Sequence, residues 1–412
     1  MCTDYHLYSQ TSHISPGLRR IINDRINSGV YHSMILVVID GQNEEFLVMN
    51  GPDEKLSPSS LIDVSGLYPL IVSLQFADMM DNGIHPKTPV NELLEKENRI
   101  KGKQSKGLML SQLALNTSGL SDTKNSEDDR KVCQEEKMNQ LNFSKRSFSF
   151  NPGSVYCQHN LDLIYLSNLL LAKYGLPCEL YFNDNLFRNL NLSKTLIVDG
   201  LEIPGIEEFD EKGILVSNVK DLSCLMRIQL GQKKKKFHSS LQELRKYVKE
   251  TRFDKSLVCP GWFVYQSDRA VFYYQQSERK KISVFMIFEP IQQKAIVIAS
   301  KSEIPLDDIA WHMMMNENLQ SVSASDIKNI KINKYVGEYS WNGEEVISIL
   351  KEGNFLIAYF NGEESHICYP IGNNTFKIAV KGITFHFVLN ENDVVDGLYL
   401  DGYSPKKFYR MN

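Results

Sequence analysis

From Tyr335 to the end of the chain, short apolar or alternating segments recur, with turn-forming dipeptides between them. Asn342-Gly343 and Asn373-Asn374 are examples, and both are typical of tight turns between strands. The expected strands cover residues 335–340, 345–351, 355–360, 364–369, 375–380, 383–389 and 397–400. Strands spaced this closely predict a small antiparallel β-barrel or sandwich.

The preceding part of the chain mixes helical and strand patterns. Apolar residues at helical spacing predict helices over residues 16–29, 65–82, 110–115, 161–174 and 220–231. Strands are expected over residues 34–39, 45–49, 262–266, 270–275, 283–288 and 295–299. The lysine run at 233–236 is interpreted as a solvated loop. We therefore expect an α+β unit over residues 1–315, a polar linker over 316–334, and a β-barrel unit over 335–412.

Composition excludes several classes of function. The formal net charge is −4 with 23% charged residues, which favours neither nucleic acid nor an anionic membrane as a partner. No apolar run is long enough to span a bilayer, and no leader-like segment opens the chain. The 7 cysteines are scattered without a CxxC pair, so reduced thiols and a cytoplasmic location are expected. No cofactor or metal motif is present, so neither is predicted.

Four phrases carry a resemblance to a known family. Ser65 to Tyr68 opens a helix, Pro152-Gly153 forms a turn, and Gly261-Trp262 precedes a strand. The most specific phrase is Leu113-Ala-Leu-Asn-Thr-Ser-Gly-Leu120. It closely resembles Leu-Leu-Thr-His-Thr-Ser-Gly-Leu of the serine β-lactamase and penicillin-binding-protein family, in its class C and D-alanyl carboxypeptidase branch. The resemblance covers about residues 14 to 305, and the tail resembles the lipocalin-like β-domain often appended to this branch.

The resemblance implies an antiparallel sheet flanked by helices, an all-α region and three catalytic motifs. The family's first motif is Ser-x-x-Lys, which places an amine beside the nucleophilic hydroxyl. Here Ser65 remains, but Tyr68 takes the place of the lysine. A phenol titrates near 10, so it is a poor base at neutral pH.

The other two motif places also differ from the family. The Tyr-x-Asn place holds Gln158-His159-Asn160, in which only the asparagine matches. His159 could act as a base, although on extended backbone it would point away from its neighbours. The His-x-Gly or Lys-Thr-Gly place is assigned to Tyr274-Gln275-Gln276, and Gln276 would crowd a substrate lying on the strand.

Three hypotheses follow. In the first, Ser65, Tyr68, Gln158, Asn160 and Tyr274 line a cleft that binds or processes a small peptide, amide or acyl compound without an acyl-enzyme, as a pseudoenzyme or as an isomerase or cyclase. Asn116 and Gln276 would add ligand contacts. In the second, a divergent serine hydrolase or acyltransferase uses Ser65 with Tyr68 or His159 as base. In the third, the β-tail docks a partner. The sequence leaves the oligomeric state open.

Each of these residues also has an ordinary structural interpretation. Ser65 suits the start of a helix, and Tyr68 and Tyr274 suit an aromatic core. Asn116 and Asn160 suit hydrogen bonds to backbone groups. Departures at all three motif places favour loss of the family's reaction.

Overall fold

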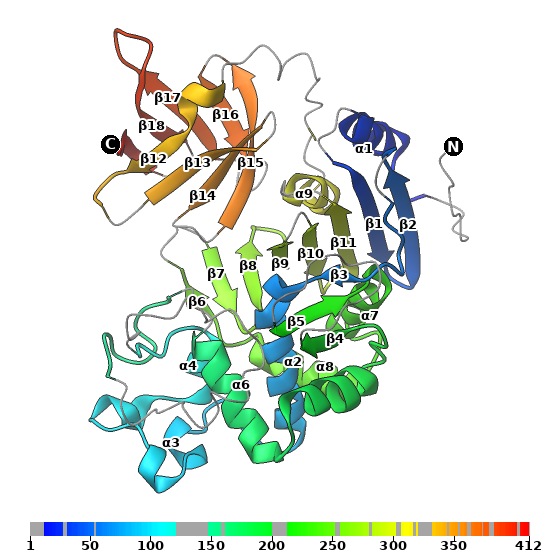
Figure 1. Ribbon diagram of the computed structural model, residues 1–412, viewed down its shortest axis with the longest axis vertical. Helices are drawn as coiled ribbons and strands as arrows, with labels where there is room; N and C mark the ends of the chain where they lie inside the picture. The colour runs from blue at the N-terminus through cyan, green and yellow to red at the C-terminus, as the bar shows by residue number, and fades with distance from the viewer. Residues whose placement is uncertain are drawn as a thin grey trace.

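The computed structural model describes residues 12–27, 31–52, 55–120, 147–157, 161–199, 212–251, 256–279, 282–301, 306–315, 319, 332–343, 346–352, 355–360, 364–372, 374–378, 383–401 and 404–411. Within them, the chain forms an eight-stranded antiparallel sheet, a three-stranded sheet, helices and a closed barrel (Figure 1). The α+β class and the small C-terminal barrel expected from the sequence are both confirmed. The boundaries of the units stay a prediction, because most of residues 316–331 lie outside the described ranges.

The large sheet has the order β2-β1-β11-β10-β9-β8-β7-β6. β1 and β2 form a hairpin around Asp40-Gly41, and β1 also pairs with β11, so segments far apart in sequence become neighbours in the sheet. The strands are β1 (Ser33–Asp40), β2 (Asn43–Asn50), β6 (Lys249–Glu250), β7 (Ser256–Cys259), β8 (Trp262–Gln266), β9 (Val271–Arg279), β10 (Ile282–Glu289) and β11 (Lys294–Lys301).

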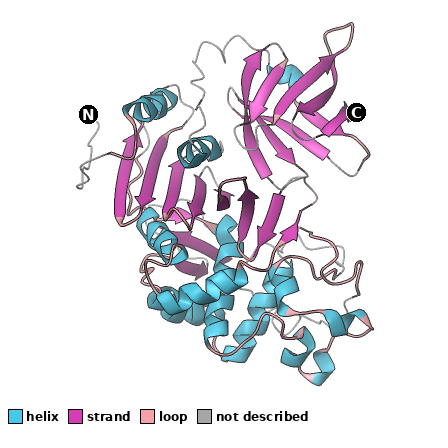
Figure 2. Cartoon of the chain, turned by 180° about the vertical axis from the view of Figure 1, so that it is seen from behind, coloured by secondary structure: helices cyan, strands magenta, loops and turns pink. Residues whose placement is uncertain are grey.

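Apolar side chains cover both faces of this sheet, which explains the continuous hydrophobic runs in β1, β10 and β11. One face packs on helices that Figure 2 shows gathered away from the barrel. The helices of this face are α2 (Tyr68–Asp81), α6 (Leu161–Tyr174), α7 (Val219–Gln229) and α8 (Lys235–Leu244). The other face packs on α1 (Pro16–Asn27) and α9 (Asp307–Met315).

A buried ion pair joins the two helices of the second face. Arg25 of α1 donates two hydrogen bonds to Asp308 of α9, with its Nη2 2.6 Å from Oδ2. The same guanidinium donates to the hydroxyl of Tyr31 at 3.1 Å. Arg25 and Asp308 are almost fully buried, so each is the main neutralising partner of the other.

Short elements complete the helical side and support the candidate site. A three-stranded sheet has the order β3-β5-β4, with β3 (Ile62–Asp63), β4 (Leu196–Asp199) and β5 (Lys212–Ser217). The remaining helical elements are η1 (Ser65–Leu67), α3 (Val90–Leu93), η2 (Lys96–Asn98), η3 (Gln104–Gly107), α4 (Leu110–Ala114) and the π-helical η5 (Leu180–Phe187).

The barrel follows the turn η6 (Ile332–Tyr335). Its strands are β12 (Gly337–Ser340), β13 (Val346–Glu352), β14 (Phe355–Phe360), β15 (Glu364–Gly372), β16 (Thr375–Ile378), β17 (Thr384–Leu389), β18 (Val395–Asp401) and β19 (Ser404–Arg410). Each pairs with the next, and β12 pairs with β19 to close the barrel. Tyr339, Phe376 and Phe385 pack together in its core, so side chains fill the interior. Ile357 packs with the α9 face of the large sheet.

The cysteines differ from the sequence prediction. Cys178 is disulfide-bonded, whereas four other cysteines form no disulfide: Cys157, Cys224, Cys259 and Cys368. The prediction of uniformly reduced thiols is therefore wrong at Cys178. Cys2 and Cys133 lie outside the described residues. The described helices include none whose length and hydropathy would carry it across a membrane.

Candidate functional site

Ser65 lies where β3 ends and the η1–α2 segment begins. Its hydroxyl oxygen accepts a hydrogen bond from the backbone N–H of Leu215 in β5 at 3.1 Å. Its own backbone N–H donates to Oδ1 of Asp63 at 2.9 Å. Val64 N–H donates to the carbonyl of Leu215, so the Ser65 side chain continues the β3–β5 ladder by one bond. In the described part of the chain, no lysine, arginine or histidine hydrogen-bonds to the Ser65 hydroxyl.

Tyr68 begins α2 and is buried in the helical core. Burial raises the pKa of its phenol above the ordinary value of 10.0, and the nearby Ser167 hydroxyl offsets this only in part. The phenol oxygen has no hydrogen-bond partner of normal geometry among the described residues. A neutral phenol in such surroundings does not take up a proton from a serine hydroxyl at neutral pH.

Asn116 occupies the turn after α4. Its φ of 52° is in the left-handed region, which asparagine tolerates better than most residues at a helix end. Its carbonyl accepts the N–H of Cys157 at 2.9 Å, so the Leu113–Leu120 phrase lies against the chain leading to the second motif. Its side-chain Oδ1 is buried and has no hydrogen-bond partner in the described ranges. Gln158, His159 and Asn160 themselves lie outside the described residues.

The rest of the Thr-Ser-Gly phrase fixes this region of the fold. The Ser118 hydroxyl donates to Oδ1 of Asp162 at 2.6 Å, and Ser118 N–H donates to Oδ2 at 3.0 Å. Gly119 has a φ of 71°, and a Cβ there would lie 2.3 Å from the carbonyl oxygen of Phe150. The phrase is therefore a packing and hydrogen-bonding unit between α4 and α6. The sequence reasoning did not single out Asp162, although its position at the start of α6 follows directly from the second motif.

Tyr274 does not lie on the same face of the sheet as Ser65. Its side chain is 3% exposed and packs with Phe263, Phe285 and Trp311 on the α9 face. Because side chains alternate along a strand, the half-buried Gln276 shares that face. The prediction that Tyr274 lines a cleft with Ser65 is therefore not supported.

Ser277 takes the place on β9 that faces Ser65. Its hydroxyl oxygen accepts the backbone N–H of Gly66 at 3.1 Å. A Cβ added to Gly66 would lie 2.6 Å from this oxygen and 2.8 Å from the Cα of Ser277. On the same face, the amide of Gln275 donates to the carbonyl of Gly261 at 3.2 Å. The sequence reasoning missed Ser277, which strand alternation would have placed opposite to Gln276.

A cation supports the turn before the second motif. Lys249 of β6 donates from Nζ to the carbonyl oxygens of Gly153 and Ser154, at 3.0 and 2.9 Å. This contact attaches the Pro152-Gly153 turn to β6, which is an edge strand of the large sheet. Sequence spacing gave no signal for this contact, because 96 and 95 residues separate Lys249 from its two partners. Over the described ranges, no three His, Cys, Asp or Glu side chains gather as metal ligands.

No protein-family model and no curated protein matches the chain. Solved structures do match. An octameric penicillin-binding protein homologue from Pyrococcus abyssi aligns with a TM-score of 0.60 at 12% identity, covering 95% of this chain and 98% of that one. A β-lactamase/D-alanine carboxypeptidase from Pseudomonas syringae aligns at 0.59 and 11% identity, covering 73% of this chain and 98% of that one.

A structure of SurE with D-Leu aligns at a TM-score of 0.56 and 14% identity, covering 95% of this chain and 98% of that one. Identities this low establish architecture and leave activity open. The chain therefore has the fold of β-lactamases and penicillin-binding proteins.

Proposed function

We propose that this protein is a non-acylating member of the β-lactamase fold, which binds a small peptide or amide compound without a covalent bond to Ser65. The observation that carries the proposal is the engagement of both polar groups of Ser65. Its hydroxyl oxygen accepts the Leu215 N–H, and its N–H donates to Asp63. A serine nucleophile needs a base beside its hydroxyl, and its N–H often stabilises the oxyanion that forms.

The surroundings of Ser65 support the same proposal. Tyr68, at the lysine place, is buried with its pKa raised by desolvation. Ser277 lies directly against Gly66, the residue that follows Ser65 in η1, so β9 is packed onto the start of the nucleophile segment. A hydrolase that used Ser65 would need to break the Leu215 bond, find another base and separate β9 from η1.

We propose the ligand class from two structurally similar proteins and from the buried side-chain oxygen of Asn116. Two structural relatives are a D-alanine carboxypeptidase and SurE with D-Leu, so compounds that carry a D-amino acid are the first to test. Oδ1 of Asn116 is buried and has no partner among the residues that the structure describes, and a buried acceptor of this kind is stabilised by a donor such as a ligand amide N–H. A non-covalent binding protein, an isomerase and a cyclase all fit such a site.

Covalent labelling tests the expectation that Ser65 is not acylated. Wild type and Ser65→Ala are incubated with a fluorescent penicillin and with a fluorophosphonate, beside an active serine β-lactamase, and intact masses are recorded. We expect an adduct on the β-lactamase and none on either form of this protein. A stoichiometric adduct on wild type that is absent from Ser65→Ala would establish the hydrolase alternative.

The binding part is tested by calorimetric titration with D-Leu and with D-Ala-D-Ala. Asn116→Gly keeps the left-handed backbone but removes the Oδ1 acceptor. We expect wild type and Ser65→Ala to bind alike and Asn116→Gly to lose most of the affinity. Absence of heat with both compounds, or equal affinity in all three proteins, would contradict this ligand class at Asn116.

A further inference from the structure

The two edges of the large sheet are built differently. At one edge, β6 has 2 residues, and its Lys249 binds carbonyl groups of a covering turn. At the other edge, β2 has 8 residues and contains no lysine, proline or bulge. Short strands, lysine, proline and bulges are the usual protection of an edge strand. β6 has two of these features, whereas β2 has as protection only the charges of Glu44 and Glu45 near one of its ends.

The alternation of hydrogen bonds between β1 and its neighbours shows which backbone groups of β2 face outward. Gly51 N–H donates to the carbonyl of His32, and Gly41 N–H donates to that of Gln293. With the β1–β2 register, these bonds show that the odd-numbered residues of β2 bond to β1. The N–H and C=O groups of Glu44, Phe46, Val48 and Asn50 therefore point away from the sheet.

These outward backbone groups have no partner in the described part of the chain. No backbone or side-chain hydrogen bond reaches the N–H or C=O of Glu44, Phe46 or Val48. All three residues are half-buried, because their side chains lie on the helical face of the sheet. Among the described residues, the edge thus presents a ladder of unpaired backbone donors and acceptors along a strand whose residues 46–49 are apolar.

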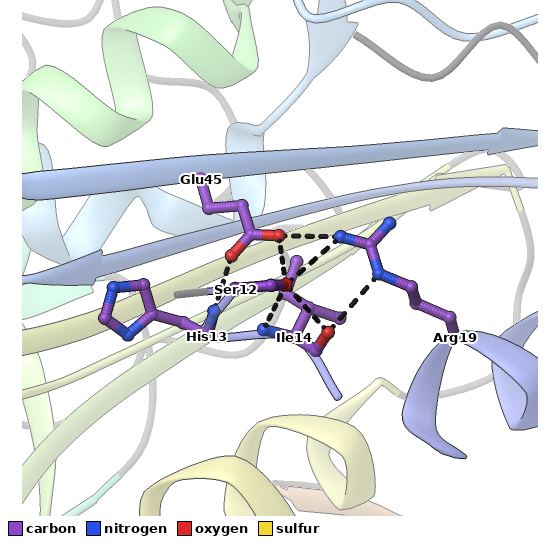
Figure 3. Close-up of polar contacts among 5 residues, drawn as sticks. All are labelled: Ser12, His13, Ile14, Arg19 and Glu45. Carbon is purple, nitrogen blue, oxygen red and sulfur yellow. Dashed lines mark hydrogen bonds and ion pairs between the residues drawn. The ribbon is translucent and has the colours of Figure 1, made fainter. Parts of the chain in front are cut away.

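Contacts on both faces hold β2 in an extended conformation. On the α1 face, Glu45 accepts hydrogen bonds from Ser12, from His13 N–H and from Arg19, with Arg19 Nη2 at 2.6 Å (Figure 3). On the α7 face, Glu44 accepts a hydrogen bond from Ser223 and lies 3.6 Å from the Arg227 guanidinium. The strand is therefore ordered before any partner arrives, which lowers the entropic cost of pairing.

We propose that the β2 edge pairs with the β2 edge of a second copy of this chain, around a two-fold axis at Leu47. In this antiparallel register, Phe46 faces Val48 of the second copy and Glu44 faces Asn50. All four outward residues then find hydrogen-bonding partners, and the two large sheets become continuous.

Self-complementarity of the strand favours a second copy over another extended peptide. The two glutamates lie near one end of β2, so the two-fold axis places Glu45 opposite Met49 and never opposite another glutamate. Apolar residues of both copies occupy the centre of the proposed interface. An isologous interface requires a surface that complements itself in this way.

Sedimentation velocity of the full chain over a range of concentrations tests the proposal. We expect wild type to reach twice the mass of one chain. Val48→Pro removes an N–H that β1 does not use, so it should remain at the mass of one chain with its fold intact by circular dichroism. Val48→Thr keeps the N–H and should associate like wild type.

A mixture of Phe46→Cys and Val48→Cys proteins tests the register. We expect oxidation to cross-link the mixture and to leave each single variant uncross-linked. Wild type that stays at the mass of one chain at all concentrations, even if it binds a strand peptide, would overturn the proposal. Association of Val48→Pro equal to that of wild type would do the same.

Discussion

The hydroxyl oxygen of Ser277 accepts the backbone N–H of Gly66 at 3.1 Å, and this contact ties β9 to the segment that opens α2. The two elements are so close that a side chain at Gly66 would meet both the hydroxyl and the Cα of Ser277. The stability of the contact is therefore the first property to measure.

Gly66→Ala should destabilise the protein by about 1–3 kcal/mol, because its Cβ forces the backbone of η1 or β9 to move. Urea denaturation measures the change. Gly107→Ala is the matched control, since nothing lies within 4 Å of a Cβ there. Equal stability of the two variants would show that η1 and β9 separate at little cost.

Tyr68→Phe should leave the free energy of unfolding unchanged or raise it by up to about 1 kcal/mol. The change removes a buried hydroxyl for which the described part of the chain offers no hydrogen-bond partner of normal geometry. Tyr68→Lys, which restores the family's residue, should instead lose several kcal/mol, since a buried ammonium lacks a counter-ion there. Thermal unfolding of both variants measures this, and a large loss in Tyr68→Phe would reveal a polar role for the phenol.

Asp78→Asn should stabilise the protein increasingly as the pH rises. Burial raises the pKa of Asp78 above its ordinary value of 3.8, the hydrogen bond from Tyr181 lowers it in part, and the charge of Asp81 adds to the rise. The folded state therefore holds the proton more tightly than the unfolded state. This contribution is fully present below the unfolded pKa and is lost as the pH rises through the folded pKa.

Urea denaturation of wild type and Asp78→Asn across the acid range checks the sign. We expect the two curves to approach each other below the ordinary carboxyl pKa and to separate toward neutral pH, with the variant more stable. Asparagine keeps an acceptor for the Tyr181 hydroxyl, so the bond at 2.8 Å is retained. A wild type that gains stability relative to the variant toward neutral pH would contradict the raised pKa.

Arg25→Met should cost about 3–5 kcal/mol, because it leaves the Asp308 carboxylate buried without its cation. The double variant Arg25→Met, Asp308→Leu should recover part of the loss. Lys246→Met, which breaks an exposed and solvent-screened pair with Glu243, should leave the stability almost unchanged. Chemical denaturation compares the three, and equal losses in the first and third would show that burial of the Arg25 pair has no energetic effect.

Much of the fold was predictable because its elements have strong local patterns. The hairpin around Asp40-Gly41 and the closely spaced strands of the barrel both follow from apolar alternation and turn dipeptides. The sequence predicted no helix over residues 235–244, where α8 lies, and the lysine run at 233–236 was interpreted as a loop. Lys234 has a φ of 52°, and the helix buries Phe237, Leu241 and Leu244 at helical spacing. That spacing was a usable signal.

The candidate site was less predictable because it depends on contacts between distant segments. Motif spacing located Ser65 and Tyr68, but it could not show that Leu215 would occupy the Ser65 hydroxyl. Tyr274 was assigned to the site by counting along a strand, and a shift of one residue along a strand reverses the face. No local pattern reveals the disulfide at Cys178.

The Arg25–Asp308 pair spans 283 residues, and β1 takes its place in the sheet only when β11 pairs with it. On a ribosome, the amino-terminal helix and hairpin would thus emerge long before the segments that complete them. Until then, the apolar strand Ser33–Asp40 has only its hairpin partner. Chaperone binding during translation should therefore concentrate on the first fifty residues, and deleting β11 should trap the nascent chain in that state.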